Sequence, residues 1–290
     1  MMKKTIPLLL LLAVVSLFAG CAKGNQAAFD KAKAIGVVSR EDGSGTRGAF
    51  IELFGIEVRG GDGSRKDMTT KEAVIAKQTD VMMTNIGGDK YAIGYISLGS
   101  LNNTVKAADI EGVKASTENV KNGAYTVSRS FNIATKGEPA ELAADFIKFI
   151  LSAEGQAVVA KSYIAIIDNA PPYTGGRLSG KIVIAGSSSV TPIMEKLKEA
   201  YIALNPNANI EIQMSDSSAG MTGAIDGTCD IGMASRELKD SELAVLSATQ
   251  IALDGIAVIV NNENPVTNLT KEEVKGIFTG AMVNWSDVIQ

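Results

Sequence analysis

The alternation of strand-like and helix-like segments is the feature that most restricts how this chain can fold. Short apolar or alternating runs that are typical of strands occur at 35–39, 92–97, 181–186, 210–214, 230–233 and 256–260. Helical spacing of apolar residues follows polar turns at 47–53, 138–149, 154–161, 192–204 and 221–225. This alternation predicts an α/β protein in which crossover connections join parallel strands.

The N-terminus has the pattern of an export signal. Lys3-Lys4 precede an apolar stretch over 6–19, which is shorter than the roughly 20 residues of a membrane-spanning helix. The stretch ends in Leu17-Phe18-Ala19-Gly20-Cys21, which resembles a bacterial lipobox. We expect residues 1–21 to be a lipoprotein signal peptide and Cys21 to be lipidated, which would anchor the protein outside the cytoplasm, at the cell surface or in the periplasm. Ordinary signal cleavage beside an incidental cysteine is the alternative.

Composition argues against several function classes. The 290 residues contain no histidine, which removes Ser-His-Asp and Cys-His catalysis and every zinc site with imidazole ligands. The net charge of -4 argues against a nucleic-acid binder. Neither a nucleotide phosphate loop nor a Gly-x-Ser-x-Gly elbow is present. We therefore expect a binding protein rather than an enzyme, without cofactor or metal, and we expect Cys229 to be a buried, inert thiol.

Three predicted strand-turn-helix junctions carry small hydroxyl or glycine residues. They are Ser44-Gly45-Thr46, Ser187-Ser188-Ser189 and Ser217-Ser218-Ala219-Gly220. A helix N-terminus has unpaired N–H donors and a partial positive charge, so such a junction attracts anions. Any one junction alone is explained as well by helix capping. Three of them, with Arg40 just before the first, predict an oxyanion site.

One motif points to a known family. The segment Ser39-Arg40-Glu41-Asp42-Gly43-Ser44-Gly45-Thr46-Arg47 resembles the signature of the PstS-type phosphate-binding proteins of bacterial phosphate ABC transporters. The likeness continues at 93–99, 129–131, 149–156, 186–190, 230–236, 251–256, 277–280 and 284–287. It implies capture of inorganic phosphate by a monomer and delivery to a membrane permease.

The order of these motifs departs from the family's usual order. In that family the Gly-Ser-Ser-Ser block opens the mature protein, whereas here it begins at Gly186, after the Asp42-to-Thr46 block. The sequence therefore resembles a circular permutant, in which residues 168–180 join the family's usual C-terminal and N-terminal regions. A natural permutation, a truncated tandem copy and an engineered chain would all give this order.

The resemblance implies a two-lobed, type II periplasmic-binding-protein fold with the ligand in the cleft between the lobes. The crossing strands should lie near 128–131 and 253–255. One lobe, 22–128 plus 255–290, would carry the loop with Arg40, Asp42 and Ser44. The other, continuous over 129–254, would carry the Ser189 and Ser217 loops.

The ligand contacts that the resemblance implies come from both lobes: Arg40, Asp42, Ser44, Gly45, Thr46, Ser189, Val190, Ser217 and Ser235. Arg40 would donate a charge-assisted hydrogen bond, and Asp42 would accept one from a protonated ligand. Ser235 stands where some family members carry aspartate and others serine. The alternative for Arg40 is a surface ion pair with Glu41 or Glu52, and for Asp42 a turn cap.

Three other functions remain open from the sequence. A receptor for sulfate, molybdate or tungstate would use the same kind of site, although those ions have no proton to offer Asp42 at neutral pH. A phosphate-ester hydrolase would need a metal or a general base. A signalling or adhesive lipoprotein would carry the same leader and fold.

Overall fold

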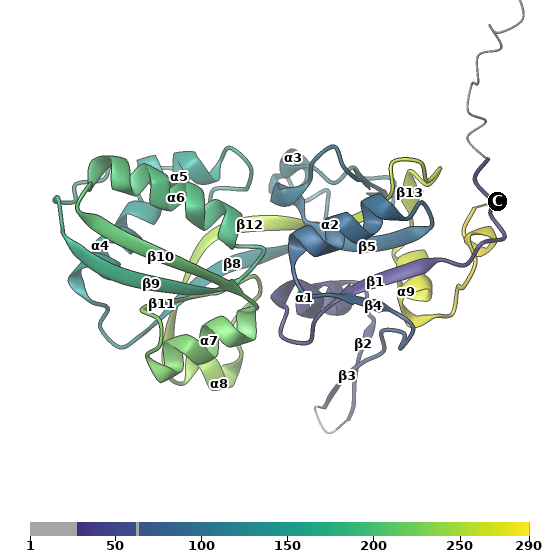
Figure 1. Ribbon diagram of the computed structural model, residues 1–290, viewed down its shortest axis with the longest axis horizontal. Coiled ribbons are helices and arrows are strands. Elements are labelled where there is room, and N and C mark those ends of the chain that lie inside the picture. Colours follow the sequence, from purple (N-terminus) through teal and green to yellow (C-terminus); the bar gives the residue numbers. More distant parts are fainter. Residues whose placement is uncertain (1–27, 62–63, 290) are drawn as a thin grey trace, which may run out of the picture. The chain divides into compact units, whose positions relative to one another are not determined.

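The computed structural model describes residues 28–61 and 64–289 (Figure 1). The expected signal peptide and Cys21 lie outside the described residues. The chain divides into two units, Met1–Asp30 and Lys31–Gln290, and the elements below belong to the second unit.

The principal sheet has the order β10-β9-β11-β8-β12-β5-β1-β4. Its strands are β1 (Gly36–Arg40), β4 (Val74–Ala76), β5 (Ala92–Ser97), β8 (Ser128–Lys136), β9 (Gly180–Ser187), β10 (Ala208–Ser215), β11 (Ile231–Ala234) and β12 (Leu246–Val260). β9 lies between its parallel partners β10 and β11, and β1 lies between its parallel partners β4 and β5. An antiparallel strand follows each trio, β8 beside β11 and β12 beside β5. The two ends of the sheet therefore repeat one arrangement, and the α/β expectation is confirmed.

The 15-residue strand β12 takes part in both repeats (Figure 1). It pairs with β8 from Leu246 to Gly255 and with β5 from Ile256 to Val260. We call the group with β4, β1, β5 and the C-terminal part of β12 the first lobe. The second lobe contains β10, β9, β11, β8 and the N-terminal part of β12. This two-lobed arrangement is the expected type II fold.

Helices cover the sheet in both lobes. The first lobe contains α1 (Gly45–Leu53), α2 (Thr79–Gly88), α3 (Thr117–Lys121) and α9 (Lys271–Thr279). The second contains α4 (Glu141–Ile150), α5 (Ala153–Val159), α6 (Thr191–Leu204), α7 (Ser217–Asp226) and α8 (Asp240–Leu243). Figure 1 shows α4, α5 and α6 on one side of the second lobe's strands and α7 and α8 on the other. None of the helices within 28–61 and 64–289 has the length and apolarity to cross a bilayer.

Small elements complete the first lobe. They are the strands β2 (Glu57–Arg59), β3 (Arg65–Asp67), β6 (Lys106–Ala107), β7 (Asp109–Ile110) and β13 (Asn268–Leu269), and the 3-10 helices η1 (Leu98–Ser100) and η2 (Trp285–Asp287). β2 and β3 pair with each other as a hairpin, and β7 pairs with β13.

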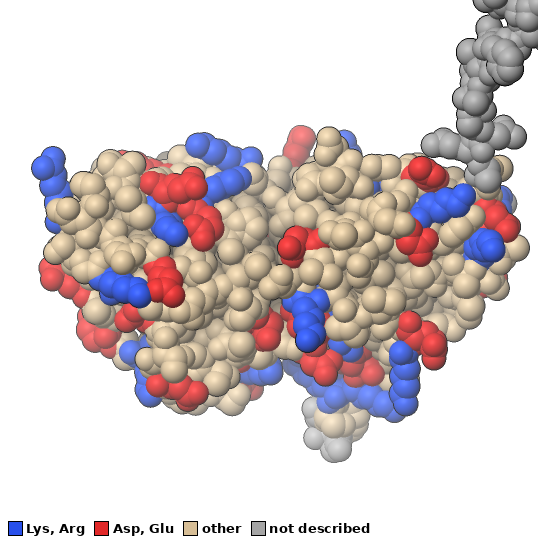
Figure 2. Space-filling view, in the orientation of Figure 1, with Lys and Arg blue, Asp and Glu red and all other residues tan. Residues whose placement is uncertain are grey.

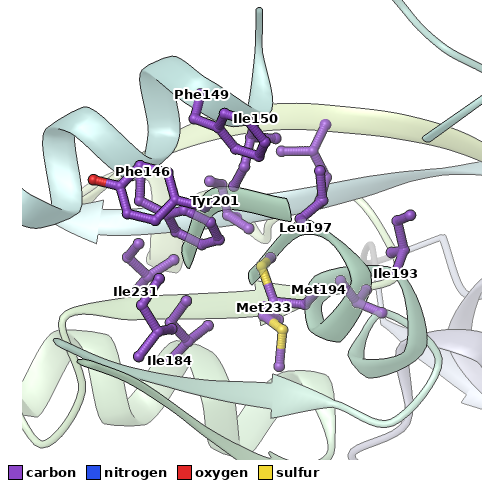
Figure 3. Packing of buried hydrophobic residues seen from close by; sticks show 14 of the residues in the cluster. Phe146, Phe149, Ile150, Ile184, Ile193, Met194, Leu197, Tyr201, Ile231 and Met233 are labelled. Atoms are coloured by element: carbon purple, nitrogen blue, oxygen red, sulfur yellow. The ribbon is translucent and has the colours of Figure 1, made fainter. Parts of the chain in front are cut away.

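The core of the second lobe forms between the sheet and helices α4 to α6 (Figure 3). Helix α4 places Leu142, Phe146, Phe149 and Ile150 on one face, because these positions recur at helical spacing. Phe146 packs edge-on against Tyr201 of α6, with ring centroids 5.0 Å apart. Burying side chains of this size contributes about 1.5–3 kcal/mol each, which makes the lobe a rigid support for the loops at its strand ends.

Two of the expected elements begin well before the predicted residue. Residues 215–220 were expected as a turn, but α7 begins at Ser217, because the Asp216 carboxylate caps it by accepting the Ala219 N–H at 2.8 Å. β12 was expected only over 256–260, yet it begins at Leu246. Its first residues include exposed Ser247 and Gln250, which break the apolar pattern without breaking the backbone pairing to β8.

The beginning and the end of the Lys31–Gln290 unit pair with each other. Ala34 bridges Asn284, the Ile35 N–H donates to the Val283 carbonyl at 2.8 Å, and the Trp285 N–H donates to the Lys33 carbonyl at 3.1 Å. This pairing lies directly before β1, the strand that ends in Arg40. The two ends of this unit are therefore neighbours in the first lobe.

Candidate anion-binding site

Four helices begin where the two lobes touch: α1 and α2 from the first lobe, α6 and α7 from the second. The Thr46 and Ser189 hydroxyl oxygens are 2.8 Å apart, and the Ser218 N–H donates to the Gly43 carbonyl at 3.2 Å. Both contacts join a residue of one lobe to a residue of the other. Hydroxyl-bearing residues in or just before the first helical turns therefore meet at one place.

The first lobe contributes the turn between β1 and α1. Ser44 caps α1 by accepting the Arg47 N–H at 3.3 Å. Gly45 follows as the first helical residue, and a Cβ there would lie 2.5 Å from the Ser217 hydroxyl oxygen and 2.9 Å from that of Ser235. Only glycine lets the start of α1 approach the second lobe this closely.

The second lobe contributes serines from three of its strand ends. The Ser187 hydroxyl donates to Ser235 Oγ at 3.0 Å, and the Ser235 N–H donates to Ser217 Oγ at 3.1 Å. All three serines are buried. Val190 behaves differently: its side chain lies in the core, and its N–H already donates to the Ser187 carbonyl at 3.0 Å.

Arg40 is the cation of the site, and it is only 1% exposed. Its Nε and Nη2 donate to the two carboxylate oxygens of Glu41 at 2.8 and 2.7 Å. Nη2 also donates to Ser188 Oγ at 3.0 Å, and Nε to the Ala76 carbonyl at 3.1 Å. Glu41 was expected only as a surface alternative, whereas the ion pair is built into the site and compensates much of the charge of Arg40.

Asp42 does not join this cluster. Its side chain is 97% exposed and accepts a hydrogen bond from Arg47 Nη1 at 2.8 Å. Arg47 also donates to the Arg40 carbonyl at 2.7 Å and to Asp67 at 2.8 Å. Asp42 therefore helps to hold Arg47 across the turn, on the outside of the protein.

The structure adds Thr79 and Tyr95, which the sequence did not single out, and it places Ser188 of the second junction against Arg40. Thr79 stands in the first turn of α2, and its hydroxyl oxygen lies 3.4 Å from those of Ser188 and Ser189. The Tyr95 hydroxyl lies 2.9 Å from Ser39 Oγ and accepts the Arg40 N–H at 3.1 Å. Burial raises the pKa of Tyr95, so it supports the end of β1 as a neutral phenol.

A buried ion pair lies beside the site, where β8 and β12 pass between the lobes. Arg129 and Asp254 are register partners in these strands, and their Nη2 and Oδ2 atoms are 3.2 Å apart. The Asp254 carboxylate also accepts the Gly99 N–H at 3.3 Å. Burial raises the pKa of Asp254 to about 6 and lowers that of Arg129, while their mutual attraction opposes both changes.

The site offers hydroxyl, N–H and guanidinium donors that converge from two lobes. Such a set surrounds a small tetrahedral oxyanion, and helix N-termini add a favourable potential. Within the part of the chain that the structure describes, no group of three or more acidic or cysteine side chains is placed to hold a metal ion. On the face drawn in Figure 2, acidic and basic side chains are interspersed over both lobes.

Known proteins share this architecture and sequence. The chain matches the PBP superfamily domain over residues 18–154 and 171–290. It is 52% identical over 276 residues to the phosphate-binding protein PstS 2 of Streptococcus agalactiae, covering 94% of both chains. A crystal structure of a phosphate ABC transporter phosphate-binding protein from Streptococcus pneumoniae is 46% identical and matches with a TM-score of 0.70, covering 88% of this chain and 100% of that one.

A more distant relative matches only in part. The phosphate-binding protein PstS of Pseudomonas aeruginosa is 34% identical over 132 residues, covering 42% of this chain and 41% of the relative. The match to the streptococcal relatives, by contrast, extends over nearly the whole chain. The chain therefore belongs to the PBP superfamily and, within it, to the PstS family of phosphate-binding proteins.

Proposed function

We propose that this protein binds inorganic phosphate outside the cytoplasmic membrane and delivers it to the membrane permease of an ABC importer. The observation that most supports this function is the cluster of hydroxyl groups around Arg40. Both lobes contribute to this cluster, and four helices begin at it. A ligand held by both lobes at once stabilises their contact, and release then requires the lobes to part. The names of the streptococcal relatives support the same ligand.

Titration calorimetry tests the proposal. The purified protein, stripped of endogenous ligand by unfolding and refolding, should bind phosphate with a stoichiometry of one per chain. Sulfate, molybdate and tungstate should bind more weakly by a large factor. Tighter binding of any of these three would identify a receptor for another oxyanion instead.

Binding without catalysis is the second part of the proposal. The site pairs its one buried arginine with Glu41, and its serines hydrogen-bond to one another rather than to a general base. A chromogenic phosphate monoester should therefore stay intact with the protein, with or without added magnesium or zinc. Turnover that follows the protein through purification, and is lost in Arg40→Ala, would contradict this part.

The proposed phosphate contacts are Arg40, Ser44, Gly45, Thr46, Ser189, Ser217 and Ser235. The sequence also indicated Val190 and Asp42. Val190 contributes mainly to the core beneath the site. The role of Asp42 as acceptor of the ligand's proton stays a prediction, and its exposed carboxylate does not support it.

We further propose that residues 22–128 and 255–290 form the first lobe and that 129–254 form the second. β12 pairs with β8 up to Gly255 and with β5 from Ile256, and this change of partner supports the division. We also propose that the chain is a natural circular permutant. An alignment over 94% of both chains supports an order shared with the Streptococcus agalactiae relative. The match to the Pseudomonas relative covers less than half of each chain. A swapped order gives such a partial match, because a single sequence alignment can follow only one of the two exchanged segments.

The proposal includes a monomer anchored to the cell membrane through lipidated Cys21. In cells fed labelled palmitate, the wild-type protein should incorporate label and sediment with membranes. Cys21→Ser should do neither. A wild-type protein that is unlabelled and soluble would refute the anchor without affecting the phosphate proposal.

A further inference from the structure

Two hydroxyls that are not among the expected ligand contacts face each other across the lobes. Thr79, in the first turn of α2, is 6% exposed, and Ser188, just before α6, is 3% exposed. Their oxygens are 3.4 Å apart. Both side chains are thus more than nine-tenths buried, in a place where an unsatisfied polar group is costly.

Among residues 28–61 and 64–289, the protons of these two hydroxyls have no partner at an ordinary distance. Ser188 Oγ accepts a hydrogen bond from Arg40 Nη2 at 3.0 Å, so its own proton must go elsewhere. Thr79 Oγ1 has contacts at 3.4 Å to Ser188, 3.4 Å to Ser189 and 3.5 Å to Arg40 Nη1. Good O–H···O hydrogen bonds span about 2.5–3.0 Å. The Thr46–Ser189 contact nearby, at 2.8 Å, is of that kind.

Arg40 leaves one donor at the same point. Its Nε and Nη2 donate to Glu41, Ala76 and Ser188, whereas Nη1 has, within the described part of the chain, only the 3.5 Å contact to Thr79. The N-cap of α2, Gln78, makes no side-chain hydrogen bond to the helix. One small region therefore receives the Nη1 group of Arg40, the hydroxyls of Thr79 and Ser188, and the start of α2, which has no side-chain cap.

This region connects to the outside. Thr79 and Ser188 line a cavity of about 390 Å³ whose wall also includes Met83 and Met214. Met214 is exposed, so the cavity leads from the surface to the two buried hydroxyls. A phosphate ion that reaches the cluster along this cavity meets Thr79 and Ser188 before the serines behind them.

We propose that Thr79 and Ser188 are further phosphate ligands, one from each lobe, that hold the side of the anion facing the cavity. The assignment rests on the proposed phosphate function. Each hydroxyl donates to a phosphate oxygen, and Arg40 Nη1 donates beside them. Thr79 and Ser188 also separate the bound ligand from the cavity, because they lie between the cluster and the cavity.

The test compares Thr79→Val and Ser188→Ala with the wild type in phosphate titrations and in release of labelled phosphate into excess unlabelled phosphate. Loss of one hydrogen bond to a charged ligand should weaken phosphate binding by about 10- to 100-fold. Release should accelerate by most of that factor, because related complexes differ mainly in dissociation rate. Thr79→Ser keeps the hydroxyl and should retain near-wild-type affinity.

Thr84→Val is the matched control. Thr84 lies on the same helix, is exposed, and donates its hydroxyl to the Asp80 carbonyl, so its loss should not change phosphate binding. If Thr79→Val and Ser188→Ala bind phosphate as tightly as Thr84→Val, the assignment is wrong. It is also wrong if Thr79→Ser is as weak as Thr79→Val, because packing of the methyl group would then be the cause. A wild type that does not bind phosphate would instead refute the proposed function itself.

Discussion

Gly45→Ala should separate binding from folding more cleanly than any other single change in the site. A Cβ at position 45 would lie 2.5 Å from the hydroxyl oxygen of Ser217 and 2.9 Å from that of Ser235. Ser217 cannot easily rotate away, because it is fully buried and accepts the Ser235 N–H at 3.1 Å. The start of α1 must therefore move back by about 0.9 Å to reach ordinary contact at 3.4 Å.

A displacement of that size breaks hydrogen bonds from the start of α1 to a ligand that the second lobe also holds. One or two charge-assisted hydrogen bonds contribute about 2–5 kcal/mol, so phosphate affinity should fall by roughly 30-fold to several thousandfold. The stability of the unliganded protein should change by no more than about 1 kcal/mol, because the clash is between the lobes, which can part without unfolding, and alanine favours a helix over glycine.

Titration calorimetry and urea unfolding without phosphate measure the two effects. Gly48→Ala is the control, since Gly48 lies on the same helix and has nothing within 4 Å of an added Cβ. That variant should gain helix stability and keep its affinity. If Gly45→Ala binds phosphate as tightly as Gly48→Ala, the lobes do not need this close approach to hold the ligand, and the reasoning fails.

Three further predictions concern the turn, the crossing strands and the chain ends. Asp42→Asn should weaken phosphate binding by less than about fivefold, because an exposed ion pair contributes at most about 1 kcal/mol. If the variant instead gains sulfate binding in calorimetry, Asp42 is the group that accepts the proton of the bound phosphate. Because burial raises the folded-state pKa of Asp254 from 3.8 to about 6, its contribution to stability is lost as the pH rises through that range. Relative to wild type, the unfolding free energy of Asp254→Asn should therefore rise by about 2 kcal/mol between about pH 4 and about pH 7, and parallel pH profiles in urea unfolding would contradict this. A variant in which a short linker joins the present ends near Ala34 and Gln290, and in which new ends are opened within residues 168–180, should fold and bind phosphate like the wild type. A soluble product without a cooperative unfolding transition would count against the permutation.

The buried strands could be predicted because their apolar runs are uninterrupted, as in β5 and β9. The first part of β12 could not, because Ser247 and Gln250 face solvent while their backbone pairs with β8. The start of α7 was misplaced for a similar reason: serines favour turns in isolation, and only the Asp216 cap makes Ser217 helical. Local composition predicts elements where one face is apolar, and long-range pairing decides the rest.

The site shows the same limit. The serine and glycine junctions could be found in the sequence, and the structure brings Thr46, Ser189, Ser217 and Ser235 together. Thr79 carries no comparable signal, because it follows Gln78 in a polar segment that reaches the cluster only through the parallel pairing of β4 with β1. The separation of Arg40 from Asp42 depends on side-chain pairing within the turn and the start of α1, which residue type alone does not predict: Glu41 binds the arginine, and Arg47 holds the aspartate outside.

The shared strand β12 has a consequence for the order in which the protein is built during synthesis. The second lobe has all its strands once the ribosome has passed Gly255, so it can collapse while the chain is still growing. The first lobe cannot, because β5 ends at Ser97 and its partner residues begin only at Ile256. β1 can pair with β4 and β5, but the other edge of β5 must wait for the last segment, which makes this lobe slow to complete and dependent on very distant contacts. A nascent or truncated chain that lacks the end of β12 would thus carry a finished second lobe next to an open sheet edge, and aggregation of incomplete chains should start at the unpaired edge of β5.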